Sequence, residues 1–583
     1  MILNARAFRP HLTALLLAGV IALVSCGSVT VTRASAFVLL ETLQAGAERE
    51  GGGESPDLFE LGLMLCDEGR WAEALPVHRR IVEGNPFYAM GWMGLGWSLH
   101  YSGRYAEAIP AYLKALELGA LRPHRIMLEI ARCHAARGDK LQALDWFGKA
   151  MRSGLPNLAQ ARADKRLELL KDEPRFKELV ADVNTSRMSR AHGWRYDLSL
   201  LSREIRRIHY DPYRNISRAE LDAEVRSIHR AIPSLTDEEI AVRFMKLMRR
   251  LGDGHSYAEA EFQYSKNRQA LPVRFSFFEE GLFIEAATPE HEDLLWARVL
   301  KFDRSPVEKV YEALGSVVPQ DNPQRVKSQG PEYLRFPQVL KALGLADKSS
   351  EVKLTVIDRH GRERVAALEV AASPLNNWVR RPSDAKAELP LFARNPGDYY
   401  WFEYFPESRV LYFQYNGCQD KKGESIEEFA ERLFGFVESH DVEKLVVDLR
   451  WNGGGNMNLS RPLVLGLTRA KQVNRHGRLF VIAGRHTFSA AMIFAEQLER
   501  FTDAIFVGEP TGSSPNFVGE TNFLTLPYGK VRASISNLYW QNSTPTDRRI
   551  WIAPRLLTPP TFESYKNGRD PALEAILDFR DRP

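Results

Sequence analysis

Three copies of one short pattern limit what this chain of 583 residues can fold into more than any other feature of its sequence. The copies begin at Gly69, Gly103 and Gly138, so they lie 34 and 35 residues apart, and each has an alanine five residues after its glycine. A repeat of this length is typically one pair of helices that cannot bury its apolar face alone, and about three units are needed for a stable stack. The pattern therefore predicts stacked helix pairs joined by glycine turns over residues 56–185.

The period and the small residues at the helix contacts resemble the tetratricopeptide repeat. Leu95 and Gly96 fit the first helix of such a repeat, and Tyr112 and Ala115 fit its second helix. The resemblance implies either a groove for a protein or peptide partner or a structural spacer, and the sequence leaves both open. We expect the charged helical segment 165–183 to close the array as a cap.

The N-terminus has the layout of an export signal. Arg6 and Arg9 precede a nearly unbroken apolar stretch over residues 12–24 that is too short for a comfortable membrane span. The run Leu23-Val24-Ser25-Cys26 resembles the lipobox of bacterial lipoproteins, with an ordinary signal and a chance cysteine as the alternative. The resemblance implies a signal peptide over residues 1–25, lipidation of Cys26, a linker over residues 26–55, and a bacterial cell-envelope protein. Gly27 after the cysteine favours an anchor in the outer membrane facing the periplasm.

Charge and cysteine content exclude several kinds of partner. The 78 lysines and arginines nearly balance 74 acidic residues, so the net charge of +4 predicts no nucleic-acid partner. We expect contact with a membrane only through the N-terminal lipid anchor. Cys66, Cys133 and Cys418 show no metal-ligand spacing, and we expect neither a metal nor another cofactor. Cys66 and Cys133 lie in helical patterns, where we expect them to be small buried residues.

Two short runs in the C-terminal part carry the chemistry. An apolar strand pattern at residues 445–447 leads into the glycine turn Asn452-Gly453-Gly454-Gly455, and a second strand pattern at residues 479–482 precedes Ser489. Apolar residues after Ser489 recur at helical spacing, so this serine stands at a strand-to-helix junction. Its hydroxyl would lie beside unpaired N–H groups that stabilise developing negative charge. This arrangement favours a nucleophile and an oxyanion hole, hence an acyl-transfer enzyme.

Two regions precede this core. Helical patterns over residues 186–256 end at Gly252-Asp253-Gly254-His255-Ser256, which places a histidine just after a helix. Strand patterns over residues 257–372 resemble a PDZ-like module, with Gly281-Leu282-Phe283 near the place where such domains bind a peptide carboxylate by adding a strand. A purely structural β-domain is the alternative.

The core motifs together resemble the C-terminal-processing (tail-specific) and tricorn-core family of serine peptidases. The resemblance covers residues 194–583 and is strongest at 445–456 and 480–520. It implies a multidomain α+β protein made of an α-helical tetratricopeptide solenoid, a helical cap, a PDZ-like β-module and an α/β peptidase core over residues 373–583. It also implies that Ser489 is the nucleophile, that the N–H groups of Gly454 and Ala490 form the oxyanion hole, and that the substrate is a polypeptide.

The same resemblance narrows the choice of general base. Tail-specific relatives place a lysine where this chain has Ser514, which disfavours a serine–lysine pair. The tricorn-like branch takes a histidine from a loop like the one that holds His255, so His255 is the expected base. Asp547 is the expected acid that orients it, and Glu520 is the alternative. A different class of function also stays open, in which the core is catalytically inactive and the chain is a lipid-anchored scaffold that binds proteins or peptides.

Overall fold

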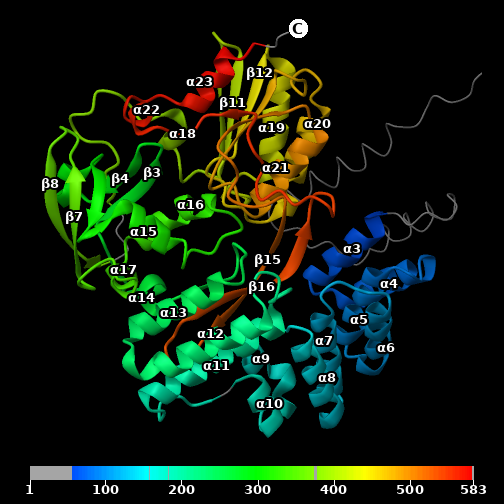
Figure 1. Ribbon diagram of the computed structural model, residues 1–583. Coiled ribbons are helices and arrows are strands. Elements are labelled where there is room, and N and C mark those ends of the chain that lie inside the picture. Colours follow the sequence, from blue (N-terminus) through cyan, green and yellow to red (C-terminus); the bar gives the residue numbers. More distant parts are fainter. Residues whose placement is uncertain (1–55, 156–157, 182, 373–376, 581–583) are drawn as a thin grey trace, which may run out of the picture. The chain divides into compact units, whose positions relative to one another are not determined.

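The computed structural model describes residues 56–155, 158–181, 183–372 and 377–580 (Figure 1). The signal peptide, Cys26 and the linker lie outside the described residues, so these predictions are not examined by the structure. The chain divides into two compact units, Met1–Asp139 and Lys140–Pro583. This division falls inside the third repeat. The architecture is multidomain α+β, as predicted, with helical repeats in the first unit and β-sheets in the second.

The first unit is built from helices that pack in sequence, each against the next. The glycine turns have the predicted geometry, because Gly103 has φ 78°, a conformation that side-chain-bearing residues rarely adopt. Ala108 is fully buried, and a Cβ on Gly96 would lie 2.5 Å from the ring of Tyr112, so only glycine allows this approach of two helices. The described helices of this unit are α3 (Pro56–Asp67), α4 (Trp71–Gly84), α5 (Ala89–Tyr101), α6 (Tyr105–Glu117) and α7 (Pro123–Ala136).

One further sequence prediction can be compared with the described helices. Cys66 and Cys133 are buried, as predicted for small residues in helical patterns. Among the residues that the structure describes, no helix has both the length and the apolar character needed to cross a membrane.

The second unit starts with short helices and continues into the predicted helical cap. Ser217 and Thr236 begin two of the cap helices, each with a glutamate three residues later that completes a capping box. These caps satisfy N–H groups that a helix start leaves unpaired. The helices are α8 (Lys140–Arg152), α9 (Leu158–Ala163), η1 (Lys165–Leu170), α10 (Pro174–Leu179), α11 (Arg190–Ile208), α12 (Arg218–Ala231), η2 (Ile232–Ser234) and α13 (Asp237–Arg249).

The PDZ-like module is a twisted antiparallel sheet with the order β3-β4-β5-β7-β8. Strand β4 (Gly281–Ala287) lies inside this sheet, paired with β3 on one side and β5 on the other. A peptide therefore cannot add to it at residues 281–283, and this part of the sequence prediction is wrong. The other elements are β2 (Gln269–Ala270), β3 (Val273–Phe278), β5 (Arg298–Phe302), β6 (Ser305–Pro306), β7 (Glu351–Ile357), β8 (Glu363–Glu369), β9 (Ala371–Ala372), α14 (Glu261–Tyr264), η3 (Pro289–Leu294), α15 (Val307–Leu314), α16 (Gln324–Tyr333) and α17 (Pro337–Ala342).

The C-terminal core is a six-stranded sheet in the order β10-β11-β12-β13-β14-β17. Its strands are parallel except for the edge strand β10. The strands are β10 (Tyr400–Phe405), β11 (Val410–Tyr415), β12 (Lys444–Asp448), β13 (Leu479–Ala483), β14 (Ile505–Gly508) and β17 (Leu556–Leu557). The helices are α18 (Leu391–Arg394), α19 (Ile426–Ser439), η4 (Met457–Ser460), α20 (Arg461–Arg469), α21 (Ala490–Phe501), α22 (Phe562–Lys566) and α23 (Pro571–Asp578).

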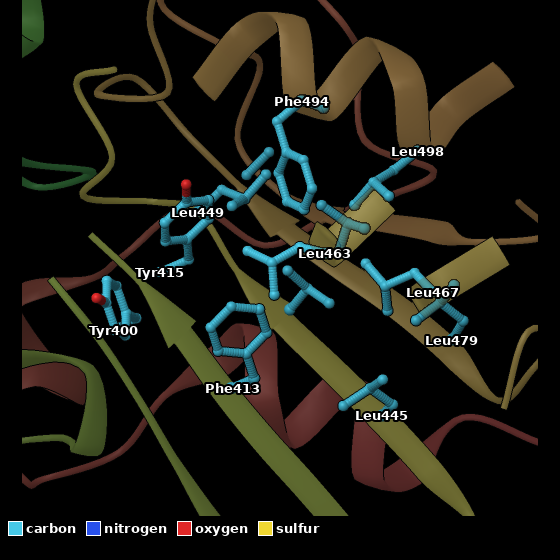
Figure 2. Close-up of a cluster of buried hydrophobic side chains, with 14 of the residues drawn as sticks. Tyr400, Phe413, Tyr415, Leu445, Leu449, Leu463, Leu467, Leu479, Phe494 and Leu498 are labelled. Carbon is cyan, nitrogen blue, oxygen red and sulfur yellow. The ribbon is translucent and has the colours of Figure 1, made fainter. Parts of the chain in front are cut away.

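Helices cover both faces of this sheet, which explains why its strands read as unbroken apolar runs. Leu445 and Val447 point to the face covered by α19, α20 and α21, while Val446 between them points to the face where α23 packs. Figure 2 shows the first of these clusters, with Phe494 of α21 and Leu463 of α20 above the strands. The carboxyl ends of β12 and β13 are thereby held on a rigid support.

A long hairpin joins the core to the end of the helical cap. Strands β15 (Asn516–Thr525) and β16 (Arg532–Gln541) pair with each other, and β16 also pairs with β1 (Tyr257–Glu259). Because β1 directly follows the loop that holds His255, this pairing ties a loop from the cap to the hairpin that follows β14.

Candidate active site

Ser489 occupies a strained junction between β13 and α21. Its φ of 55° and ψ of −125° are rare for a residue with a side chain, and it is the residue from which α21 begins. Such strain persists only where surrounding contacts impose it, and a serine on a sharp strand-to-helix turn presents its hydroxyl outward. Ser489 is partly exposed, so a substrate can reach its Oγ.

Hydrogen bonds from the neighbouring turn impose this conformation. The hydroxyl of Thr487 donates to the carbonyl oxygen of Leu449 at 2.9 Å, and the N–H of Phe488 donates to the carbonyl oxygen of Asn452 at 3.1 Å. The turn after β13 is therefore fastened to the turn after β12. The two motifs that the sequence singled out form one structural unit.

The glycine turn approaches the serine closely but does not supply the predicted donor. Gly454 has φ 104°, and a Cβ there would lie 2.7 Å from the Cβ of Ser489. However, the N–H of Gly454 donates to Oδ1 of Asn452 at 2.9 Å, so this amide already has an acceptor. The assignment of Gly454 to the oxyanion hole is therefore corrected. The N–H of Ala490, at the first turn of α21, makes no hydrogen bond among the described residues.

The structure brings His255 to the serine across 234 residues of sequence. Nε2 of His255 lies 3.0 Å from Oγ of Ser489, which is hydrogen-bond distance. Gly254 permits this approach, because a Cβ there would lie 2.7 Å from the ring of Phe488. The geometry is that of a serine nucleophile with a histidine base.

Asp253 holds the loop that carries His255. Its Oδ1 accepts the N–H of His255 at 2.9 Å, the N–H of Ser256 at 2.6 Å and the hydroxyl of Ser536 at 3.2 Å. Nε2 of His209, in the segment after α11, lies 2.9 Å from the other carboxylate oxygen. Although burial acts to raise the pKa of Asp253, the hydrogen bond and charge of His209 hold it below its ordinary value. The loop that carries His255 is therefore held by an ionised carboxylate of its own, to which the sequence analysis assigned no role.

Two aromatic rings enclose the imidazole of His255. Phe488 stacks on it at a centroid distance of 4.3 Å, and Phe517 stacks on it at 5.3 Å. This burial lowers the pKa of His255 to about 4, against the charge of Asp253, which acts to raise it. His255 is consequently neutral near pH 7 and available as a proton acceptor.

The structure does not bring either predicted acid to His255. Nδ1 of His255 is buried and makes no hydrogen bond to either acid. An interaction with the backbone of Val518 acts to raise the pKa of this ring. Asp547 instead binds Arg549, with 2.8 Å between Oδ2 and Nη2, and this ion pair lowers the pKa of Asp547. Glu520 lies on β15 with φ 62° and makes no hydrogen bond to His255. The assignment of Asp547, with Glu520 as alternative, is therefore not supported by the geometry.

A second acid and an arginine near the loop were also missed. Asp321 accepts the N–H of Gly254 at 2.9 Å and the hydroxyl of Ser513 at 2.6 Å, and burial raises its pKa to about 6. The guanidinium of Arg325 lies 3.6 Å from the ring centroid of Phe488. Asp321 precedes α16 and Arg325 lies in it, and neither residue belongs to a local sequence motif. No signal in the sequence indicated these two residues, because they lie far from the peptidase core in the chain.

The described residues contain no group of three or more histidine, cysteine, aspartate or glutamate side chains that could hold a metal ion. Ser514, at the position where tail-specific relatives carry a lysine, donates its hydroxyl to the carbonyl oxygen of Ile550 at 3.2 Å.

Two family models match the chain. Residues 409–547 match Peptidase family S41, and residues 59–123 and 93–154 match the tetratricopeptide repeat. The chain thus combines tetratricopeptide repeats with a segment that matches Peptidase family S41, which confirms these two of the resemblances found in the sequence. No curated protein matches the chain.

Solved structures show similarity to one part of the chain or the other. Mature CPAF complexed with lactacystin is 14% identical, covers 66% of this chain and 97% of its own, and has a TM-score of 0.48. The photosystem II D1 C-terminal processing protease is 12% identical, with coverages of 66% and 96% and a TM-score of 0.34. The Yersinia enterocolitica type III secretion translocator chaperone SycD is 21% identical, with coverages of 22% and 81% and a TM-score of 0.17.

Proposed function

We propose that this chain is a serine peptidase that hydrolyses peptide bonds of polypeptides through an acyl-enzyme on Ser489. The observation that carries the proposal is the 3.0 Å separation between Oγ of Ser489 and Nε2 of His255. The strained turn at Ser489 and the match of residues 409–547 to Peptidase family S41 add independent support.

The chemistry follows from the positions of these groups. Neutral His255 accepts the hydroxyl proton at Nε2 while Oγ of Ser489 attacks the scissile carbonyl carbon. The negative charge that develops on the carbonyl oxygen is stabilised by the N–H of Ala490 and the N-terminus of α21. His255 then returns the proton to the leaving amine, the C–N bond breaks, and a water molecule activated by the same imidazole hydrolyses the ester.

Labelling with a fluorophosphonate probe tests this proposal, because the probe reacts only with an activated serine. The full chain is expected to take one label, and Ser489→Ala is expected to abolish it. His255→Ala is expected to lower the labelling rate by about 10²- to 10⁴-fold, the range that general-base catalysis typically contributes. Ser439→Ala and His440→Ala are matched controls, since both side chains are exposed at the end of α19 and distant in sequence from the site.

A folded chain that takes no label and cleaves no polypeptide would overturn the proposal. That result would favour the alternative function, a catalytically inactive scaffold that binds proteins or peptides through its repeats. Circular dichroism of each variant separates loss of folding from loss of the nucleophile.

We further propose that the protein is held in the bacterial cell envelope by a lipid on Cys26, and that its repeats bind a polypeptide partner. The lipobox-like run before Cys26 supports the anchor. Metabolic labelling with an alkyne fatty acid is expected to mark the chain and to fail in Cys26→Ser. Equal labelling of both chains would contradict the anchor.

A further inference from the structure

A cavity separate from the Ser489–His255 pair lies between the PDZ-like module and the core. It holds about 740 Å³ of empty space, part of which is open to solvent, and its walls come from β3, β4 and the carboxyl ends of β12, β13 and β14. Helix α22 closes one side of the cavity and lies near β4 (Figure 1). Phe562 of α22 stacks on Phe283 of β4 at a centroid distance of 4.0 Å. Ligands of open α/β sheets bind at the carboxyl ends of the strands, which is the position of this cavity.

Three polar side-chain atoms in the cavity wall are buried without a hydrogen-bond partner among the described residues. They are Nε1 of Trp451, Oγ1 of Thr558 and Oη of Tyr565. Tyr565 is only 4% exposed, so water does not reach its hydroxyl freely. All three groups can donate a hydrogen bond. Buried polar groups are rarely left unpaired, so three donors around one cavity indicate a ligand with acceptor oxygens.

The charged side chains of the same wall already have ion-pair partners, within the wall or beside it. Arg485 binds Glu509, with 2.8 Å between Nε and Oε2, and Glu285 binds Arg380 at 2.9 Å. Arg450 binds the carboxylates at both of its sides, which are Asp448 at 2.8 Å and Asp570 at 2.7 Å. The wall therefore offers no uncompensated cation to a carboxylate or phosphate, and an uncharged acceptor such as a peptide carbonyl fits it better.

The rest of the wall is apolar and suits a hydrophobic side chain. Aromatic and aliphatic residues surround the donors, and the aromatic rings provide large contact areas. These apolar residues are Phe277, Phe278, Phe392, Ile482, Ala483 and Ala572.

The cavity wall and the candidate active site share the two turns that follow β12 and β13. The rings of Trp451 and His486 contact each other at a centroid distance of 4.8 Å. Trp451 precedes Gly454 by three residues, and His486 precedes Ser489 by three residues. Three residues span at most about 10 Å of extended chain, so the cavity wall begins within a few substrate residues of the nucleophile.

We propose that this cavity is a subsite that takes an apolar side chain of the polypeptide substrate. The peptide carbonyls that flank this side chain accept hydrogen bonds from Trp451, Thr558 and Tyr565. The inference rests on the proposed peptidase function and adds to it the substrate feature that the enzyme selects.

Peptide cleavage by hydroxyl-deletion variants tests the subsite. Tyr565→Phe and Thr558→Val each remove one hydroxyl with little change of volume, and Tyr404→Phe is a matched control whose hydroxyl bonds the carbonyl oxygen of Asp441 instead. The substrates are quenched fluorescent peptides in which one position at a time carries phenylalanine or glycine. The chain is expected to prefer phenylalanine at one position, and each variant is expected to lower kcat/KM for that peptide by about 3- to 10-fold, as for one ordinary hydrogen bond.

The control reactions separate the subsite from the peptidase. Tyr404→Phe is expected to leave the cleavage of both peptides and the labelling by a small fluorophosphonate unchanged. In Tyr565→Phe and Thr558→Val the preference for phenylalanine over glycine is expected to fall, because the flanking carbonyls are held against the donors only when an apolar side chain occupies the cavity. In Ser489→Ala protein, calorimetric titration with the phenylalanine peptide is expected to show the same 3- to 10-fold weakening of Kd when Tyr565→Phe is added. Equal cleavage of both peptides by all variants, or equal loss for both peptides, would overturn the subsite while leaving the peptidase intact. Absence of fluorophosphonate labelling in the unmodified chain would instead overturn the peptidase.

Discussion

Asp253→Asn tests whether the carboxylate of Asp253 positions the loop that carries His255. This residue is 4% exposed and accepts hydrogen bonds from two backbone amides, one hydroxyl and one imidazole. Asparagine keeps one acceptor oxygen for the three donors that use Oδ1, but it removes the charge and places an N–H₂ group toward His209. The variant therefore changes charge and one contact while preserving the size of the side chain.

The cost can be estimated from these contacts. Nδ1 of His209 accepts the N–H of Asp211 at 3.1 Å, so Nε2 carries the proton and would face the new N–H₂ group. A buried donor without an acceptor costs about 1–3 kcal/mol, and each backbone amide that loses a charged acceptor loses about 1 kcal/mol more. We expect the free energy of unfolding to fall by about 3–5 kcal/mol. We also expect fluorophosphonate labelling to slow by about 10- to 100-fold, since small displacements of a catalytic group cost on this order.

Two measurements distinguish positioning from general stability. Labelling rates are measured at temperatures where urea titration shows each variant to be fully folded, and the pH dependence of labelling is recorded. Because the charge of Asp253 acts to raise the pKa of His255, its removal is expected to shift the acid inflection to lower pH. Asp547→Asn, which removes the acid expected from the sequence, is the comparison, and its ion pair with the half-exposed Arg549 is worth at most about 1 kcal/mol. A larger loss of labelling in Asp547→Asn than in Asp253→Asn, with no shift of the inflection in the latter, would refute the reasoning.

Three further predictions concern the same site. Labelling of Ser489 is expected to be lost as the pH falls through about 4, because burial lowers the pKa of His255 to that value and only the neutral imidazole accepts a proton; an inflection near 6.5 in protein that circular dichroism shows to be folded would contradict this. Burial raises the pKa of Asp321 from 3.8 to about 6. The contribution of this group to the free energy of unfolding is therefore fully present below pH 3.8 and is lost as the pH rises through about 6. Asp321→Asn is therefore expected to raise the free energy of unfolding by about 1–3 kcal/mol above about pH 6. A lower free energy of unfolding for this variant above about pH 6, measured by urea titration, would contradict the prediction. Gly454→Ala is expected to slow labelling by on the order of 10²-fold, since its Cβ would meet Ser489, whereas Gly453→Ala, which meets no atom within 4 Å, is expected to label normally; equal rates would contradict the close approach.

Local patterns in the sequence predicted the elements of the fold well. Turn glycines such as Gly103 and the buried alanine at position 108 follow from the repeat, and both behave in the structure as the pattern requires. The apolar runs that lead to Asp448 and to Ser489 are buried parallel strands. These predictions succeeded because periodicity, glycine conformation and helix starts depend on residues close together in the chain.

Predictions that needed residues far apart in the chain were less complete. One local contact was also missed, since Asn452, two residues from Gly454, accepts the N–H that was assigned to the oxyanion hole. The strand addition at residues 281–283 is wrong because the order of strands in a sheet cannot be read from any one strand. Asp253 lies two residues before His255 in the sequence, yet its partner His209 lies 44 residues before Asp253, and this pairing distinguishes the acid from other loop carboxylates.

The sequence by itself determined the chemical groups and their local setting, which are a serine at a strand-to-helix turn, a glycine turn after the preceding strand, and a histidine after a helix. Tertiary structure alone decided that Ser489 and His255 meet at 3.0 Å, that Phe488 and Phe517 remove water from the imidazole, and that Asp253 rather than Asp547 holds the loop. The physical reason is that backbone conformation is set by neighbouring residues, whereas burial, charge pairing and pKa depend on groups that only the packed sheet and its hairpin bring together.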